Sequence, residues 1–545
     1  MKRFIYLVLF GLIFAVSSLA QVSNQMPVVT RTYAFTNINI VQGPGRRMDN
    51  ATLLIKDGLI AGVGKNISIP PDAIVIKADS MYAYAGFIDG LCKSGVSAHY
   101  NGSSEKVLDP GSPPPALAGI NPQNEVRTML NPDDKEIEQL RNLGFTTAQV
   151  IPQGNFLPGQ AAVILLNGKS ANEMLLVNKS ALYTDLIGTR GIYPSTILGV
   201  MAKWRELYRQ SELAKTYEHM YASNPTGLIR PTSDRILEAF YPVIDQQLPV
   251  LVKSEKMMDV QHALALKSDL GFLLLLADVK EGWPLTKNIK ASGAKVFLSL
   301  DLPEEKKMKT STEKPTAFED VEREDLEKRK ADAVSKCNAQ PVNFQRAGIA
   351  FGFCSYSAKV KDIPANLRRM ISAGLTEDEA LAALTTTPAK FLGLSDRMGT
   401  VDQGMIANLV ISDKSYFLEN AKVQYVIVDG NVYPIETKTG IKIEGGWTIV
   451  IQTSRGSMND RLHIRKEGNT YAGTYFSESL PAPVDLREVS LKGNLLSFKY
   501  KLGNNPDAPD MVAEVTVTGK TFKGVVNGAR FKNLAIEGVL DTRNR

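Results

Sequence analysis

Apolar and polar residues alternate with a period of two in two separate blocks of the chain, at residues 33–64 and 404–433. Such alternation is typical of strands with one buried face. In the first block, Lys56-Asp57-Gly58 stands between apolar strands and has the composition of a tight hairpin turn. We expect residues 28–85 and 399–438 to pair into one small composite β-sandwich. Two unrelated β segments are the alternative.

Between these blocks, short apolar runs alternate with stretches of helical periodicity, such as residues 135–143 and 258–271. The runs have the length of buried strands and lie at 146–151, 249–253, 272–277, 295–300 and 349–353. Repeated strand–helix alternation is typical of a parallel sheet. We therefore predict an α/β fold, with a (β/α)8 TIM-like barrel over residues 86–398 inserted in the composite sandwich. A doubly wound open sheet is the structural rival, but no glycine-rich phosphate loop follows a first strand.

Two further segments differ from the predicted barrel in composition and residue pattern. Residues 303–336 are dense in charges of both signs, which is typical of a solvated loop and an exposed helix. From residue 441 onward, glycine-containing turns separate alternating strands. We predict that residues 441–545 form a C-terminal all-β domain, either a β-barrel or a β-sandwich module.

The N-terminus has the pattern of an export signal. Lys2 and Arg3 precede the apolar run 4–16, and Ser18-Leu19-Ala20 supplies small residues for cleavage. We expect residues 1–20 to be a signal peptide and the mature protein to be periplasmic or secreted, with no membrane attachment after cleavage. A transmembrane anchor is the alternative, although the run is short for a span of roughly 20 residues.

Composition limits the chemistry further. The 545 residues exceed what one core normally supports, so two or three domains are expected. A formal charge of +6 over this length gives no reason to expect a nucleic-acid partner. Three cysteines are too few for a disulfide framework. The four histidines stand at positions 99, 219, 262 and 463, in none of the usual metal-ligand spacings.

Several segments together resemble one known family. Residues 83–93, 374–389, 399–411 and 426–430 resemble, in order, segments of the amidohydrolase superfamily, in its imidazolonepropionase-like secreted branch. The segment Phe156–Gly168 also resembles a loop and hairpin of that branch, and we expect it to cover the barrel mouth. The resemblance implies a barrel enzyme that hydrolyses non-peptide or dipeptide C–N bonds with zinc or another divalent metal.

The metal-ligand positions implied by this resemblance are occupied by other residue types. The two histidines of the first barrel strand fall on Leu91 and Lys93, and the aspartate of the eighth falls on Cys354. The fifth-strand histidine falls on Lys253 and the sixth near Asp278, while no fourth-strand lysine can be placed. Leucine has no donor atom for a metal, and a protonated lysine repels one. We therefore expect no metal cofactor.

Two interpretations of this altered site remain open. In the first, Lys93 or Lys253 replaces the charge of the metal and pairs with Asp278 or Glu255, so the protein is a binding or partner protein. In the second, these groups, or Cys354 as a nucleophile, form a rearranged active site of a working amidohydrolase. No catalytic residue can be assigned from the sequence. The expected partners are a small molecule or peptide-like ligand at the barrel mouth, and a second copy or an active relative.

Overall fold

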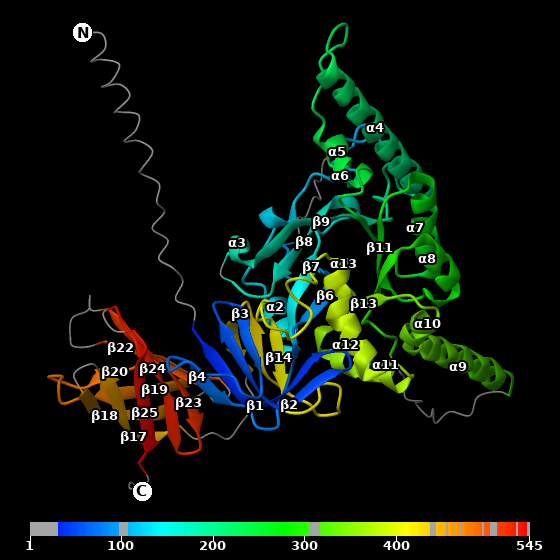
Figure 1. Ribbon diagram of the computed structural model, residues 1–545. Coiled ribbons are helices and arrows are strands. Elements are labelled where there is room, and N and C mark those ends of the chain that lie inside the picture. Colours follow the sequence, from blue (N-terminus) through cyan, green and yellow to red (C-terminus); the bar gives the residue numbers. More distant parts are fainter. Residues whose placement is uncertain are drawn as a thin grey trace, which may run out of the picture.

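The protein has three parts, a mixed sheet, a helix-covered barrel and a C-terminal sheet, and in Figure 1 the mixed sheet lies between the other two. This computed structural model describes residues 31–97, 107–168, 170–304, 317–435, 443–453, 456–467, 470–492, 495–501, 509–529 and 532–541. The predicted signal peptide lies outside these residues. No helix in the described ranges has both the length and the apolar character needed to cross a bilayer.

The first sheet combines strands from the two ends of the predicted barrel. Its path is β16-β15-β14-β5-β1-β2-β3, with β4 also paired to β1. Strand β14 runs antiparallel to β5, with Val410 opposite Tyr84, so the two alternating blocks meet as predicted. These hydrogen bonds join all eight strands into one mixed sheet. The strands are β1 (Tyr33–Gly43), β2 (Arg46–Lys56), β3 (Leu59–Gly64), β4 (Ile74–Lys77), β5 (Tyr82–Ala85), β14 (Leu409–Ser412), β15 (Val423–Val428) and β16 (Asn431–Pro434).

The predicted hairpin turn between β2 and β3 is present. Asp57 and Gly58 have φ angles of 52° and 75°, which is the left-handed region that a two-residue hairpin of this hand requires. Asp tolerates this conformation better than most residues, and Gly adopts it without steric cost. The local sequence therefore fixes the register of β2 against β3.

The central part is an eight-stranded barrel whose first strand, β6, lies beside its last, β13. The strands follow one another in chain order around the barrel. They are β6 (Phe87–Cys92), β7 (Phe145–Val150), β8 (Phe156–Leu165), β9 (Leu175–Asp185), β10 (Val250–Lys253), β11 (Leu274–Val279), β12 (Lys295–Ser299) and β13 (Phe351–Cys354). All five apolar runs predicted as strands between residues 146 and 353 correspond to members of this barrel.

One strand departs from the predicted (β/α)8 pattern. Strand β8 runs antiparallel to both neighbours, β7 and β9. The physical reason is the short connection from Val150 to Phe156, because a parallel return needs a crossover of a dozen or more residues. All ten residues of β8 are buried in the barrel wall. The expectation that residues 156–168 cover the barrel mouth was therefore wrong.

Helices cover the outside of the barrel, and two of them project from it in Figure 1: α4, and the charged helix α9. Helices α2 and α7 correspond to the two predicted from periodicity. The helices are α2 (Lys135–Asn142), α3 (Ala171–Met174), α4 (Ile197–Ser223), α5 (Arg235–Glu238), α6 (Tyr241–Ile244), α7 (Met257–Leu270), α8 (Thr286–Ser292), α9 (Ala317–Asn338), α10 (Gln340–Arg346), α11 (Ile363–Ser372), α12 (Glu377–Leu384) and α13 (Thr386–Phe391).

The C-terminal part is all-β, as predicted. Its nine strands form an antiparallel sheet with the path β20-β19-β18-β17-β25-β24-β23-β22-β21, and β19 lies beside β21, so the sheet is barrel-like. Trp447, Tyr475 and Phe522 lie in its own apolar core. The strands are β17 (Gly445–Thr453), β18 (Gly456–Glu467), β19 (Thr470–Phe476), β20 (Val484–Asp485), β21 (Arg487–Lys492), β22 (Leu495–Lys501), β23 (Asp510–Thr518), β24 (Thr521–Asn527) and β25 (Leu534–Leu540).

Candidate functional site

The interior of the barrel is apolar and closely filled. Leu91, Tyr183, Phe297 and Cys354 belong to one buried cluster contributed by four different strands. Cys92 instead packs in the larger cluster between barrel and helices, as the alternation of side chains along a strand requires. Cys92, Cys337 and Cys354 are all free thiols. Two of the five candidate positions, Leu91 and Cys354, are therefore parts of a hydrophobic core.

Ion pairs link the C-terminal ends of neighbouring strands. Lys253, the last residue of β10, lies opposite Asp185, the last residue of β9. Its ammonium Nζ is 3.4 Å from Oδ2 of Asp185 and 2.9 Å from Oε1 of Glu255. Lys280 extends the series, with its Nζ 3.6 Å from Oε2 of Glu255 and 2.8 Å from Oδ2 of Asp301. The predicted pair between Lys253 and Glu255 is thus present.

The surroundings of Lys253 favour its charged form. Burial alone would lower the pKa of Lys253, but Asp185 and Glu255 together raise it above the usual value for lysine. Burial raises the pKa of Glu255, but Lys253 and Lys280 lower it by more, so this pKa lies below its usual value. Burial raises the pKa of Asp185, although Lys253 opposes this effect. A fixed ammonium group therefore lies at the mouth of the barrel.

Asp278 has different partners from those expected. It is fully buried with a φ of 56°, and its carboxylate accepts hydrogen bonds from Ser299 Oγ at 2.6 Å and from Ser357 Oγ. Its backbone N–H donates to Cys354 Sγ at 3.3 Å. Burial raises the pKa of Asp278, while the two hydroxyl groups lower it in part. Hydroxyl groups, and not Lys93 or Lys253, hold this carboxylate in place.

Asp89 is a second buried carboxylate of the barrel mouth. Its oxygens accept hydrogen bonds from the backbone N–H groups of Leu91 at 3.1 Å and Ser355 at 3.0 Å, and from the Ser355 hydroxyl. Burial raises the pKa of Asp89 to about 7, although these hydrogen bonds oppose the effect. Asp89 is not among the residues that the sequence singled out, and its contact with Ser355 after the eighth strand was missed.

Tyr356 lies close to both candidate lysines. The Nζ atoms of Lys93 and Lys253 are 5.7 Å and 5.3 Å from the centroid of its ring, within range of a cation–π contact. Lys93 is exposed and makes no ion pair with a carboxylate in the described part of the chain. Of the two lysines, only Lys253 has the ion-pair geometry expected of a replacement for a metal charge.

These groups do not fit a divalent metal ion. Leu91 offers no donor, and Lys253 is held charged by its carboxylate partners. Burial raises the pKa of the Cys354 thiol well above its usual value, whereas a metal needs the thiolate. Among the described residues, no group of three or more histidine, cysteine, aspartate or glutamate side chains could hold a metal. His99 lies outside the described residues, and the other histidines lie on α4, α7 and β18.

Comparison with known proteins agrees with this architecture. Residues 284–433 match the sequence model of the amidohydrolase family. This segment begins shortly after β11, the sixth barrel strand, and ends in β16. The sequence similarity to this family therefore covers the last two strands of the barrel and the strands that follow it. Members of this superfamily hydrolyse C–N bonds. No curated protein sequence matches the chain.

A solved amidohydrolase structure has a similar fold over about three quarters of this chain. An amidohydrolase from Thermotoga maritima superposes with a TM-score of 0.60 at 19% identity, over 74% of this chain and 100% of that one. A Xaa-Pro dipeptidase with methionine bound in its active site gives a TM-score of 0.42 at 13% identity, over 74% and 100%. A putative prolidase from Bifidobacterium longum gives 0.40 at 14%, over 75% and 97%.

Proposed function

We propose that this amidohydrolase-superfamily protein lacks the usual metal centre and acts as a binding or partner protein outside the cytoplasm. The observation that carries the proposal is the ammonium of Lys253, which lies between Asp185 and Glu255 at the ends of the fourth and fifth barrel strands. This group supplies positive charge to the carboxylates without a metal ion. A divalent cation placed beside it would meet direct electrostatic repulsion.

The apolar filling of the barrel supports the same proposal. Leu91 and Cys354 are fully buried with Phe297 and Tyr183, so the first-strand and eighth-strand positions contribute packing to the interior. Burial raises the pKa of the Cys354 thiol well above its usual value, so this side chain is a protonated thiol and not a thiolate ligand or nucleophile. We assign the chain to the imidazolonepropionase-like branch with degenerate metal motifs, on the sequence blocks quoted above.

Metal content and turnover together test the proposal. The mature, exported protein is purified without chelator, dialysed in buffer containing zinc and then in metal-free buffer, and its zinc, manganese and iron are measured by mass spectrometry. We expect well under one metal ion per chain, and no turnover of dipeptide, lactam or cyclic-amide substrates. A stoichiometric metal that survives the dialysis in metal-free buffer, or turnover that Cys354→Ala abolishes, supports a rearranged amidohydrolase site instead.

Export and association form separate parts of the proposal. We propose cleavage of the signal before Gln21, release into the periplasm or medium, and assembly with a second copy or an active relative. N-terminal sequencing of the exported chain and its mass in solution by light scattering test these points. A mature chain that begins at Met1 and stays in the cytoplasm would contradict export. A strictly monomeric chain that retains no relative would contradict the partner role.

A further inference from the structure

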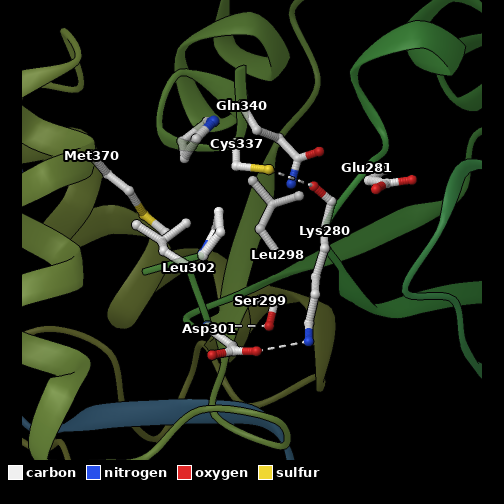
Figure 2. Close-up of a pocket in the computed structure, with 11 residues that line it drawn as sticks. Lys280, Glu281, Leu298, Ser299, Asp301, Leu302, Cys337, Gln340 and Met370 are labelled. Atoms are coloured by element: carbon white, nitrogen blue, oxygen red, sulfur yellow. Dashed lines mark hydrogen bonds and ion pairs between the residues drawn. The ribbon is translucent and has the colours of Figure 1, made fainter. Parts of the chain in front are cut away.

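A cavity of about 270 Å³ lies beside the barrel mouth, outside the ion pairs of Lys253. The residues that line it, most of them labelled in Figure 2, come from the C-terminal end of β12, from the segments that follow β11 and β12, and from α9, α10 and α11. Its size is near the lower end of the range for small-molecule sites, so it suits a ligand of few atoms. None of the vestigial metal-ligand positions Leu91, Lys93, Lys253, Asp278 or Cys354 lines it.

The cavity has an apolar wall and a polar end. Leu298, Leu302, Pro341 and Met370 form the apolar wall. At the other end, Lys280 and Asp301 point toward one another, and Figure 2 shows their ion pair below the apolar side chains. Gln340 also lines the cavity, but its amide is engaged by Gly282 N at 2.7 Å and by Val279 O at 2.9 Å. An occupant therefore meets a charged group at one end and hydrocarbon along its length.

The balance of charge at the polar end is negative. The ammonium of Lys280 pairs with Asp301 in the cavity and with Glu255 outside it. Glu255 also pairs with Lys253. Glu281 adds a second carboxylate to the cavity lining and has no ion pair within the described ranges, so two carboxylates and one ammonium line the cavity. Lys280 bonds Oδ2 of Asp301, and no described residue donates a hydrogen bond to Oδ1. A cationic donor that reached Oδ1 would give both oxygens of this carboxylate a charged hydrogen-bond partner.

We propose that this cavity binds a small aliphatic amine, with the ammonium at Asp301 and the hydrocarbon chain against Leu302 and Met370. A carboxylic acid of the same length fits the apolar wall equally well but meets the excess of negative charge. An alcohol fits the wall and lacks the charge. This binding site goes beyond the proposed function and does not depend on the absence of a metal from the barrel mouth, so the two proposals can fail separately.

Cys337 provides a reporter within the cavity. Its thiol lines the wall and is partly exposed, with Sγ 4.0 Å from the carbonyl oxygen of Lys280. The other two cysteines, Cys92 and Cys354, are 1% and 0% exposed in the core. Alkylation of the folded protein by N-ethylmaleimide should therefore modify Cys337 first, and a molecule in the cavity should slow that reaction.

The experiment measures the alkylation rate of Cys337 by peptide mass spectrometry with n-pentylamine, pentanoate or 1-pentanol in the buffer at constant pH and ionic strength. Affinity for so small a probe is expected in the millimolar range. At about ten times its dissociation constant the amine leaves roughly one cavity in ten free, so alkylation slows about tenfold. Pentanoate should have no effect, and 1-pentanol should need a several-fold higher concentration.

Variants locate the effect. Asp301→Asn and, separately, Glu281→Gln should weaken protection by pentylamine, whereas the exposed and distant Asp72→Asn should leave it unchanged. The second variant keeps the test informative if Asp301→Asn fails to fold, which circular dichroism checks. Equal protection by pentanoate, no protection by the amine at any concentration, or full protection in both folded variants would overturn the proposal. Absence of any reaction at Cys337 would overturn it as well, because the cavity would then be closed to small molecules.

Discussion

Ser355 donates two hydrogen bonds to the carboxylate of Asp89, one from its backbone N–H at 3.0 Å and one from its hydroxyl group. Ser355 directly follows β13, the eighth strand of the barrel, and Asp89 belongs to β6, the first strand. The backbone ladder runs from β13 round to β6 without pairing these two strands to each other. The Asp89–Ser355 contact therefore joins the barrel where its backbone hydrogen bonds do not.

The buried carboxyl of Asp89 should make stability depend on pH. Its pKa is raised to about 7 by burial, so the protonated form is favoured in the folded state. This contribution to stability is fully present below the unfolded pKa, near 4, and is lost as the pH rises through about 7. Asp89→Asn keeps the shape of the side chain without its charge. As the pH rises from 4 to 8, we expect the free energy of unfolding of this variant to increase relative to that of the wild type, by about 4 kcal/mol at most. Urea unfolding across this range measures it, and parallel curves for the two proteins would contradict it.

Cys354→Asp should destabilise the protein more than Cys354→Asn, in which the new side chain has the same shape as aspartate but no charge. The new carboxylate would be buried close to Asp278 and Asp89, which already raise the pKa of the thiol at this position. We expect an additional loss of roughly 2 kcal/mol or more at pH 8, because an unpaired buried charge is costly. The difference should shrink at pH 5, where the new carboxyl is protonated. Equal melting temperatures of the two variants at both pH values would refute this account.

Lys253→Met should destabilise the barrel by roughly 2 to 4 kcal/mol, because it leaves Asp185 and Glu255 without their shared cation. The matched control is Lys359→Met, since Lys359 pairs with Glu304 at 3.7 Å with both side chains largely exposed. For the control we expect a change below about 1 kcal/mol. Chemical denaturation at low and high salt compares them. A Lys253 variant as stable as the control would show that the buried ion pairs contribute little.

Gly90→Ala should disrupt the barrel interior, and a smaller side chain at position 297 should restore it in part. A Cβ atom at position 90 would lie 2.0 Å from Cδ1 of Phe297, and the same ring also lies against Gly352. We expect Gly90→Ala to cost at least about 3 kcal/mol. Phe297→Leu alone should cost less, and the double variant should be more stable than the sum of the single changes predicts. Simple additivity in thermal unfolding would show that the ring does not cause the effect.

Much of the fold followed from local patterns, but the direction of β8 did not. Alternation identified both blocks of the first sheet, and short apolar runs identified five barrel strands, because each pattern records which faces are buried. Residues 156–165 are buried along their whole length and show no alternation of polar and apolar residues, so periodicity gives no orientation. The orientation follows from the short connection after Val150, whose length becomes apparent only when the strand ends are known.

Residues of the candidate site could be predicted from the sequence only where they lie at the end of a recognisable strand. Lys253 closes a short apolar run, so its place at the barrel mouth could be inferred from sequence. Asp185 lies at the end of the apolar run Leu182-Tyr183-Thr184 and could have been found by the same rule. The hydrogen bonds of Asp89 and Asp278 to Ser355 and Ser357 join residues far apart in the chain, and no local pattern indicates them.

The pairing of β5 with β14 has a consequence for the newly made chain. Ala85 pairs with Leu409, and the whole barrel is synthesised between these two residues. At roughly 5–20 residues per second, β5 exists for tens of seconds before its partner is available. An unpaired strand edge during that time is a template for pairing with other chains. A truncation before residue 409 would make that exposure permanent, so early stop codons should yield aggregated protein and not a shorter soluble form.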